Sequence, residues 1–146
     1  AQTYIRYGTV CPATADGRLA GTPYASSFSP SLDVKTDGLL SVIQSFSKFD
    51  MKNIINGGPL TIEIHGTVLR NDIGIKKTAM LVKEYIMLGG HQLQINSVNR
   101  EELLDAQKNP EKHKNLIVRV WGWSGYFNEL DKEYQDHVIR RTEYNL

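Results

Sequence analysis

The spacing of hydrophobic residues changes period several times between residues 36 and 141, and this alternation limits the folds open to the chain. Apolar residues that recur every three or four positions predict helices, and apolar residues that alternate with polar ones predict strands. In chain order we expect a helix capped by Thr36 or Asp37, a strand at 60–65, a helix at 75–88, a strand at 92–98, a helix at 99–107, a strand at 116–120 and a helix at 130–141. Strands that alternate with helices are typical of the α/β class.

Particular residues also predict where the 75–88 helix ends, where the 99–107 helix begins and which face of the 75–88 helix is buried. Gly89-Gly90 is suited to the end of the 75–88 helix, because glycine adopts the left-handed conformation of a helix C-cap. The run Asn99-Arg100-Glu101-Glu102 resembles a capping box at the start of the next helix. We expect the 75–88 helix to bury one face, formed by Ala79, Val82, Tyr85 and Ile86.

Residues 1–35 show neither a helical nor a strand period. Pro12, Pro23 and Pro30 interrupt them among glycine, serine and threonine residues, which predicts an irregular segment. So long a structureless stretch is unusual inside a compact domain. We therefore expect it to pack against protein beyond these residues.

Composition excludes several classes of function. The chain has 146 residues, 40% of them hydrophobic and 23% charged, which is globular rather than disordered composition. Its 17 basic and 16 acidic residues nearly cancel, which argues against nucleic acid as a partner. We see no bilayer-spanning run and no secretion signal. The lone cysteine, Cys11, suits a reducing compartment, and we expect a cytoplasmic protein with no membrane partner.

The usual catalytic constellations are weak in this sequence. The four histidines, at 65, 91, 113 and 137, do not share a face at ligand spacing, so no metal site is predicted. Ser124 lies in Gly-Trp-Ser-Gly, which breaks the nucleophile pattern G-x-S-x-G. Cys11 has no predicted base beside it and is interpreted as an inert thiol. The stretch Val118–Phe127 is more unusual, because an apolar strand runs into aromatic and glycine residues; its simplest interpretation is a buried strand followed by a tight turn.

Four motifs, in this order, match one known family. They are Asp16-Gly17-Arg18-Leu19-Ala20-Gly21-Thr22-Pro23 (DGR-x-AG-x-P), Gly89-Gly90-His91-Gln92-Leu93-Gln94-Ile95-Asn96 (GG-x-[QH]-x-Q-x-N), Leu103-Leu104-Asp105-Ala106 with Pro110-Glu111-Lys112 (LLDA-x(n)-PEK), and Arg119-Val120-Trp121-Gly122-Trp123 (RV-[SA]-G-[YF]). The chain resembles the C-terminal, glycine radical segment of glycyl radical enzymes related to pyruvate formate-lyase. That family includes dehydratases, arylacetate decarboxylases, and aryl- and alkylsuccinate synthases.

The resemblance implies that Gly122 stores the radical, and that Gly125 is a loop glycine. Loss of a Cα hydrogen leaves a radical shared by the flanking peptide groups, which needs a near-planar Cα without the crowding of a Cβ. The flanking residues that the resemblance places in the radical loop are Arg119, Val120, Trp121, Trp123 and Ser124.

The resemblance also implies what surrounds the chain. A separate activating enzyme, with S-adenosylmethionine and an iron–sulfur cluster, would install the radical, while this chain would bind no cofactor or metal. The fold would be the last part of a ten-stranded α/β barrel, whose remainder carries a thiyl cysteine, and the full enzyme could be a homodimer. Residues 1–35 would pack on that barrel, and residues 36–146 would form a glycine radical domain with its loop near 119–127 and a final helix at 130–141.

Trp121 and Trp123 stand where smaller side chains are usual in the family, so we expect an apolar or aromatic substrate and C–C bond formation or cleavage. The alternative is that the two indoles seal the loop into the core. Other functions remain open: a radical dehydratase or other C–X lyase, an autonomous subunit that repairs an oxygen-damaged enzyme, or a non-catalytic structural fragment.

Overall fold

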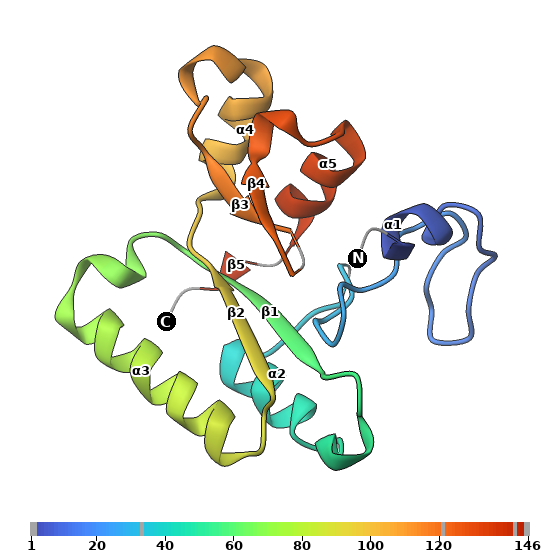
Figure 1. Ribbon diagram of the computed structural model, residues 1–146, viewed down its shortest axis with the longest axis vertical. Helices are drawn as coiled ribbons and strands as arrows, with labels where there is room; N and C mark the ends of the chain where they lie inside the picture. Colours follow the sequence, from blue (N-terminus) through green and yellow to red (C-terminus); the bar gives the residue numbers. More distant parts are fainter. Residues whose placement is uncertain (1–2, 33, 121, 142, 145–146) are drawn as a thin grey trace.

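The computed structural model describes residues 3–32, 34–120, 122–141 and 143–144, and it is a mixed helix and sheet structure (Figure 1). The helices are α1 (Thr3–Gly8), α2 (Leu39–Phe46), α3 (Asp72–Met87), α4 (Arg100–Lys108) and α5 (Lys132–Arg140). The strands are β1 (Pro59–Ile64), β2 (Gln92–Asn96), β3 (Ile117–Arg119), β4 (Ser124–Tyr126) and β5 (Glu143–Tyr144). No described helix combines the length and the hydropathy needed to cross a membrane.

A parallel sheet with the order β2-β1-β5 forms the first half of the structure. One face of β1 carries Leu60, Ile62 and Ile64, and these residues share a core with α2 and α3. The other face carries Thr61 and Glu63, which are also buried. Burial of both faces is usual for a parallel strand, because connecting segments cover the sheet on each side.

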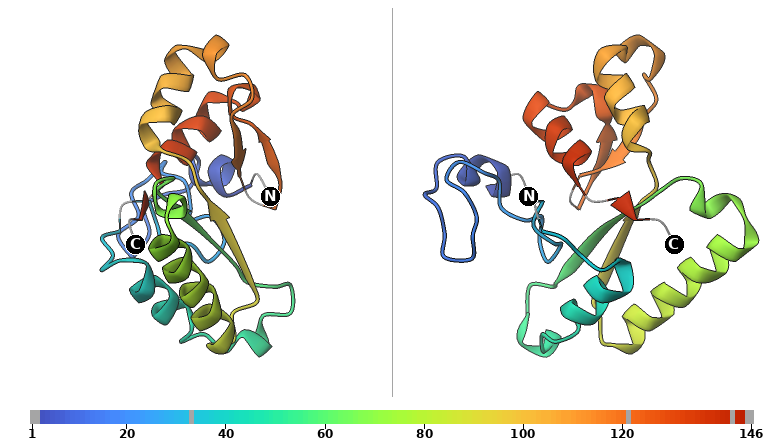
Figure 2. Two further views of the ribbon diagram at one scale, coloured as in Figure 1. Left: turned by 90° about the vertical axis from the view of Figure 1, so that its left-hand side faces the viewer. Right: turned by 180° about the vertical axis from the view of Figure 1, so that it is seen from behind.

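The second half consists of the β3–β4 hairpin packed against α4 and α5, with a core of its own around Val118, Val120 and Phe127. Figure 2 shows this half beside one end of the parallel sheet, where β2 leads into α4. β3 and β4 form a separate two-stranded sheet, so main-chain pairing does not join the hairpin to the parallel sheet. Side chains make that connection.

The end of α3 confirms the prediction for Gly89-Gly90. Gly89 has φ +85° and its N–H donates to the Ile86 carbonyl, while the Gly90 N–H donates to the Tyr85 carbonyl. These two bonds form a Schellman motif, which satisfies carbonyls that the helix leaves without partners.

The prediction that residues 1–35 are irregular was wrong at α1, which is a helix. Ile5 is buried, and Gly8 approaches the backbone of Pro23 so closely that a Cβ would lie 2.6 Å from its Cα. Tertiary contact therefore stabilises a helix that is too short to show a period. Further along, the Phe28 N–H donates to the Pro59 carbonyl, so the irregular part packs along β1.

The predicted buried face of α3 was wrong in part. Tyr85 is buried as expected and Val82 is half-buried, but Ala79 and Ile86 are exposed, and Gly74 and Leu81 are buried instead. Apolar residues occur on several sides of this helix, so their period could not choose the buried one. Gly74 decides it, because a Cβ there would lie 1.8 Å from the Val68 carbonyl oxygen; only glycine allows this approach.

Two predicted caps were wrong as well. Gly38, rather than Thr36 or Asp37, is the N-cap of α2. Asn99 is the N-cap of α4, but its side chain does not cap the helix; its Oδ1 accepts from the Gly66 N–H at 2.9 Å. A connection between distant segments thus replaces the expected local bond.

Candidate functional site: the hairpin that carries Gly122

The β3–β4 hairpin places Gly122 at its tip. Register pairs Val118 with Gly125 and Arg119 with Ser124, and the Val120 N–H donates to the Trp123 carbonyl at 3.0 Å. Residues 120–123 connect β3 to β4, and the Val120–Trp123 bond continues the pairing by one step beyond the strands. The predicted loop at 119–127 was wrong in this respect, because β4 and a short 3-10 helix (Phe127–Glu129) occupy its second half. Alternating burial over three residues is too brief a signal to predict a strand.

Gly122 is exposed and has φ +70°, in the left-handed region that favours glycine. A Cβ built on it would meet no described atom within 4 Å. The Cα of Gly122 is therefore accessible, and backbone conformation rather than space explains the preference for glycine here. Trp121, which the sequence places in the radical loop, lies outside the described residues.

Gly125 has a different role. A Cβ at Gly125 would lie 2.6 Å from the Cζ3 atom of Trp123, so the indole packs directly over this glycine. Trp123 is half-buried and contacts the core of the second half. This packing favours the interpretation that the Trp123 indole seals the hairpin onto the core.

Arg119 and Ser124 face each other across the hairpin, where Arg119 Nη1 donates to Ser124 Oγ at 3.3 Å. Val120, on the opposite side of the strand, is buried. The side chains of Arg119 and Ser124 thus lie on the solvent side of the hairpin, and that of Val120 lies in the core. The core contact holds the base of the hairpin, while its tip is exposed.

Asn96, at the end of β2, binds both backbone groups of Arg119. Asn96 Oδ1 accepts from the Arg119 N–H at 2.9 Å, and Asn96 Nδ2 donates to the Arg119 carbonyl at 2.9 Å. A side-chain amide here reproduces the pair of bonds that a neighbouring strand would make. Nδ2 also donates to Glu63 Oε1 at 3.0 Å.

Arg141, directly after α5, extends the same network. Its Nη1 donates to the Arg119 carbonyl and to Glu63 Oε1, both at 2.9 Å, and its Nη2 donates to the Val120 carbonyl at 2.5 Å. The side chains of Arg141 and Glu63 are only 8% and 7% exposed. Charge-assisted hydrogen bonds at such burial are strong, and the guanidinium fork suits two adjacent acceptors. Asn96 lies in a family motif and Arg141 in the C-terminal tail that resembles the family, but the sequence analysis assigned no role to Glu63, Asn96 or Arg141.

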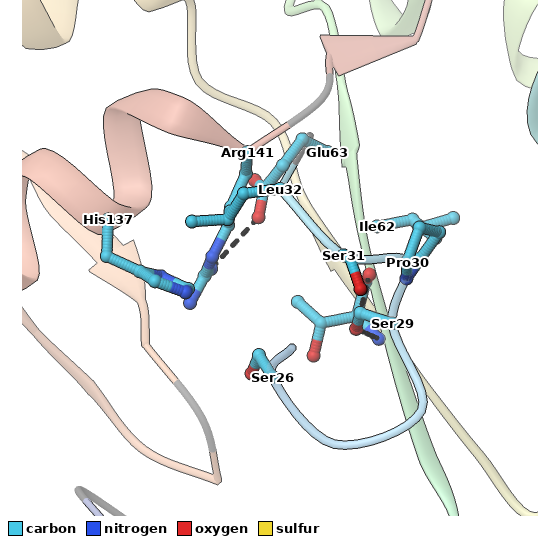
Figure 3. A pocket seen from close by; sticks show the side chains of 10 residues that line it. Ser26, Ser29, Pro30, Ser31, Leu32, Ile62, Glu63, His137 and Arg141 are labelled. Carbon is cyan, nitrogen blue, oxygen red and sulfur yellow. Dashed lines mark hydrogen bonds and ion pairs between the residues drawn. The ribbon is translucent and has the colours of Figure 1, made fainter. Parts of the chain in front are cut away.

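A small cavity of about 30 Å³ lies beside Arg141, between α5 and the segment around Ser26 (Figure 3). His137 borders it and is 3% exposed, with neither ring nitrogen hydrogen-bonded to a described residue. Burial, followed by the positive charges of Arg141 and Arg140, lowers the pKa of His137 from 6.5 to about 3. The ring is therefore neutral at physiological pH.

The other residues considered as catalytic or metal-binding candidates do not take part in the hydrogen-bond network of the hairpin. His113 Nε2 lies 2.7 Å from Asp105 Oδ2, and this hydrogen bond lowers the pKa of Asp105, which is a structural pairing. Cys11 is half-buried in the segment after α1. Within the described ranges no three metal-ligating side chains come together.

Comparison with protein families identifies the class. The family model described as glycine radical matches residues 24–128, which include the hairpin tip. The chain belongs to the glycyl radical enzyme family, as its motifs predict, and corresponds to the segment that carries the glycine radical signature.

Individual relatives agree with this membership. The chain is 38% identical over 141 residues to trans-4-hydroxy-L-proline dehydratase of Clostridioides difficile, covering 96% of the chain and 18% of that protein. It is 38% identical over 143 residues to the 4-hydroxyphenylacetate decarboxylase glycyl radical subunit of C. difficile strain 630, covering 97% and 16%. Among solved structures, the B12-independent glycerol dehydratase from Clostridium butyricum with glycerol bound matches with a TM-score of 0.93 and 37% identity, covering 98% of the chain and 18% of that protein. The chain thus spans less than a fifth of the length of these relatives.

Proposed function

We propose that this chain is the radical-storing part of a glycyl radical enzyme and that Gly122 holds the unpaired electron. The observation that carries the proposal is the position of Gly122: it is an exposed glycine with φ +70° at the tip of a hairpin whose base is buried. A glycine Cα in such a place can lose a hydrogen atom and flatten without meeting a neighbour. The match of the family model to this region supports the assignment.

Two hydrogen-atom transfers define the role of Gly122. In activation, its Cα–H bond breaks homolytically and the hydrogen atom passes to a radical supplied by a separate activating enzyme, which uses S-adenosylmethionine and an iron–sulfur cluster. In turnover, a hydrogen atom passes from a cysteine Sγ–H on another part of the enzyme to the Gly122 Cα, which leaves a thiyl radical to attack the substrate. Cys11 is not proposed as that cysteine, because it lies beside the Asp16-Gly17-Arg18 motif and matches no catalytic cysteine of the family.

The remainder of the enzyme is proposed to complete an α/β barrel around Gly122. The parallel sheet β2-β1-β5 would form part of its wall, and the relatives' greater length supplies the rest. We also propose that the complete enzyme is a homodimer.

For the reaction, we propose C–C bond formation or cleavage on an apolar or aromatic substrate. Similarity to 4-hydroxyphenylacetate decarboxylase, and at 39% identity to indoleacetate decarboxylase of Tractidigestivibacter scatoligenes, supports this class. Trp123 does not add support, because its indole packs on Gly125. The alternative is a radical dehydratase, which the similarity to hydroxyproline and glycerol dehydratases favours.

Electron paramagnetic resonance on the anaerobically activated protein tests the radical site. We expect a doublet from the wild type and none from Gly122→Ala. The variant should still fold, because the added methyl meets no described atom. Gly57→Ala is a matched control: Gly57 has φ +83° and an equally empty Cβ position, so it reproduces the backbone strain away from the hairpin. It should keep the signal.

Exposure of the activated protein to oxygen gives a second readout. Cleavage at Gly122 should release a fragment of residues 123–146, identified by mass spectrometry. Absence of the doublet from activated wild type, or a fragment that begins elsewhere, would overturn the assignment of Gly122. A repair subunit or a structural fragment would be distinguished by mixing: only the former restores activity to an oxygen-cleaved enzyme.

A further inference from the structure

We infer that Arg141 is a positioning residue that latches the radical hairpin to the parallel sheet, together with Glu63 and Asn96, and that release of its guanidinium frees the hairpin as a unit. The inference rests on the proposed function of Gly122, since it concerns where that residue is held. It assigns a role to three side chains outside the radical loop.

The location of the acceptors is the first argument. Arg141 binds the carbonyls of Arg119, the last residue of β3, and of Val120, the residue after it, so both acceptors lie just before Gly122 in the chain. A guanidinium fixed on two consecutive carbonyls sets both the position and the direction of the chain entering the turn. A lysine ammonium is a point charge and cannot impose that direction.

The lack of main-chain pairing is the second argument. β3 pairs with β4, and the two sheets are separate among the described strands. The hydrogen bonds that tie Arg119 and Val120 to the rest of the molecule come from Asn96 and Arg141. Such side-chain bonds can break while the β1–β2 ladder and the Val120–Trp123 closure of the hairpin remain intact.

Burial and charge are the third argument. Glu63 projects from the polar face of β1 and its Oε1 accepts from Arg141 (Figure 3). The same Oε1 atom accepts from Asn96, so one carboxylate orients both donors. Both members of the Arg141–Glu63 pair are more than nine-tenths buried. A buried ion pair of this kind contributes more to a specific arrangement than to net stability, which suits a latch.

The cavity beside Arg141 could admit a small molecule to the network of Arg141, Glu63 and Asn96. The cavity beside Arg141 is lined by Ser26, Ser31 and His137, and Arg141 Nε has no hydrogen-bond partner among the described residues. A small planar cation could therefore occupy the place of the guanidinium once the side chain is shortened.

Amide hydrogen exchange on the chain before activation tests the latch without relying on the radical. In Arg141→Lys we expect the amide of Arg119, whose N–H donates to Asn96 Oδ1, to exchange roughly tenfold faster or more, the effect of losing a charge-assisted hydrogen bond. The amides of residues 60–64 and 93–96 should keep their wild-type rates. Arg140→Lys, one position earlier on α5, is the matched control and should change neither group.

Chemical rescue separates positioning from general stability. In Arg141→Ala, millimolar guanidinium should restore slow exchange of the Arg119 amide, whereas the same concentration of sodium chloride should not. If Arg141→Ala does not fold, as judged by circular dichroism, Arg141→Lys alone decides the question.

Two results would overturn the latch: unchanged exchange of the Arg119 amide in Arg141→Lys, or an increase that spreads equally to residues 60–64. Failure of the proposed function looks different, because it removes the resonance doublet from activated wild type and leaves these exchange rates as they are. If both proposals hold, activated Arg141→Lys should keep the doublet but lose it faster in air than wild type does.

Discussion

His137 lies on α5 beside the Arg141 guanidinium and packs edge-on against Tyr4, with ring centroids 4.9 Å apart. Burial and the positive charges of the neighbouring arginines both disfavour the protonated form of the His137 imidazole. An imidazole that stays neutral can lie beside the latch without repelling the guanidinium or competing with it for Glu63. The single residue thus links the pH of the medium to the stability of the region that supports the hairpin.

We predict that His137 makes the folded chain sensitive to acid. Its folded pKa of about 3 lies below the unfolded value of 6.5, so between these limits the unfolded chain binds a proton that the folded chain does not. Stability should therefore be full above pH 6.5 and fall as the pH decreases, by at most about 1.4 kcal/mol per unit from this group. Denaturant unfolding at pH 7 and pH 5 measures the difference.

The control for this prediction is a ring without titratable nitrogens. His137→Phe should have nearly the wild-type free energy of unfolding at pH 7 and a smaller loss at pH 5. His91→Phe replaces an exposed histidine and should retain the wild-type pH dependence. An equal loss in wild type and His137→Phe would contradict the role of His137.

In the hairpin, Gly122 and Gly125 are both glycine for different physical reasons. Gly122 needs glycine for its backbone conformation, and Gly125 needs it because the Trp123 indole occupies the place of a Cβ. The open tip and the packed base follow from this difference. The hairpin thus exposes the Gly122 Cα while Trp123 anchors it to the core.

We predict that alanine substitutions at the two glycines separate stability from radical storage. Gly122→Ala should lower the free energy of unfolding by only about 1 kcal/mol, the strain of a positive φ, and abolish the radical. Gly125→Ala should cost about 1–3 kcal/mol, because the indole must move from the core, and should keep the doublet. Urea unfolding and electron paramagnetic resonance measure the two effects. The reverse pattern would mean that Gly125 is the radical site.

Large apolar side chains remain exposed on more than one side of α3. Ile73, Met80 and Met87, spaced seven residues apart along one face, and Ile86 on another face are each more than 60% exposed. Exposed apolar side chains in such numbers on one helix are unusual for a protein that exists alone. Their exposure agrees with a chain that covers less than a fifth of its relatives and would continue into a larger structure.

We predict that the isolated chain associates through this surface. Sedimentation velocity should show oligomers that grow with concentration, and the double substitution Met80→Lys with Met87→Glu should reduce them without lowering the free energy of unfolding, since neither side chain is in the core. Lys83→Glu with Glu84→Lys changes exposed charges on the same helix without reducing its apolar area and should leave association unchanged. A monomer at all concentrations would contradict the prediction.

Local signals were sufficient for much of the fold. The helix expected after Thr36 or Asp37, the strand expected at 60–65 and the helix expected at 130–141 correspond to α2, β1 and α5 to within a few residues, and Gly89-Gly90 ended α3 as expected. These features depend on backbone preferences and on spacing, which act between near neighbours. The family was also predictable, because its motifs are short and lie in a definite order.

Other features depend on residues that meet only after folding. Gly74 chooses the buried face of α3 through the Val68 carbonyl, and Asn99 binds Gly66 instead of its own helix. The network of Glu63, Asn96 and Arg141 joins positions up to 78 residues apart. Sequence alone therefore determined the class of protein, since its motifs are local patterns, and the same patterns led to the proposal of Gly122. Tertiary structure alone decided what holds that glycine in place, because a buried charge finds its partners only when distant segments are brought together.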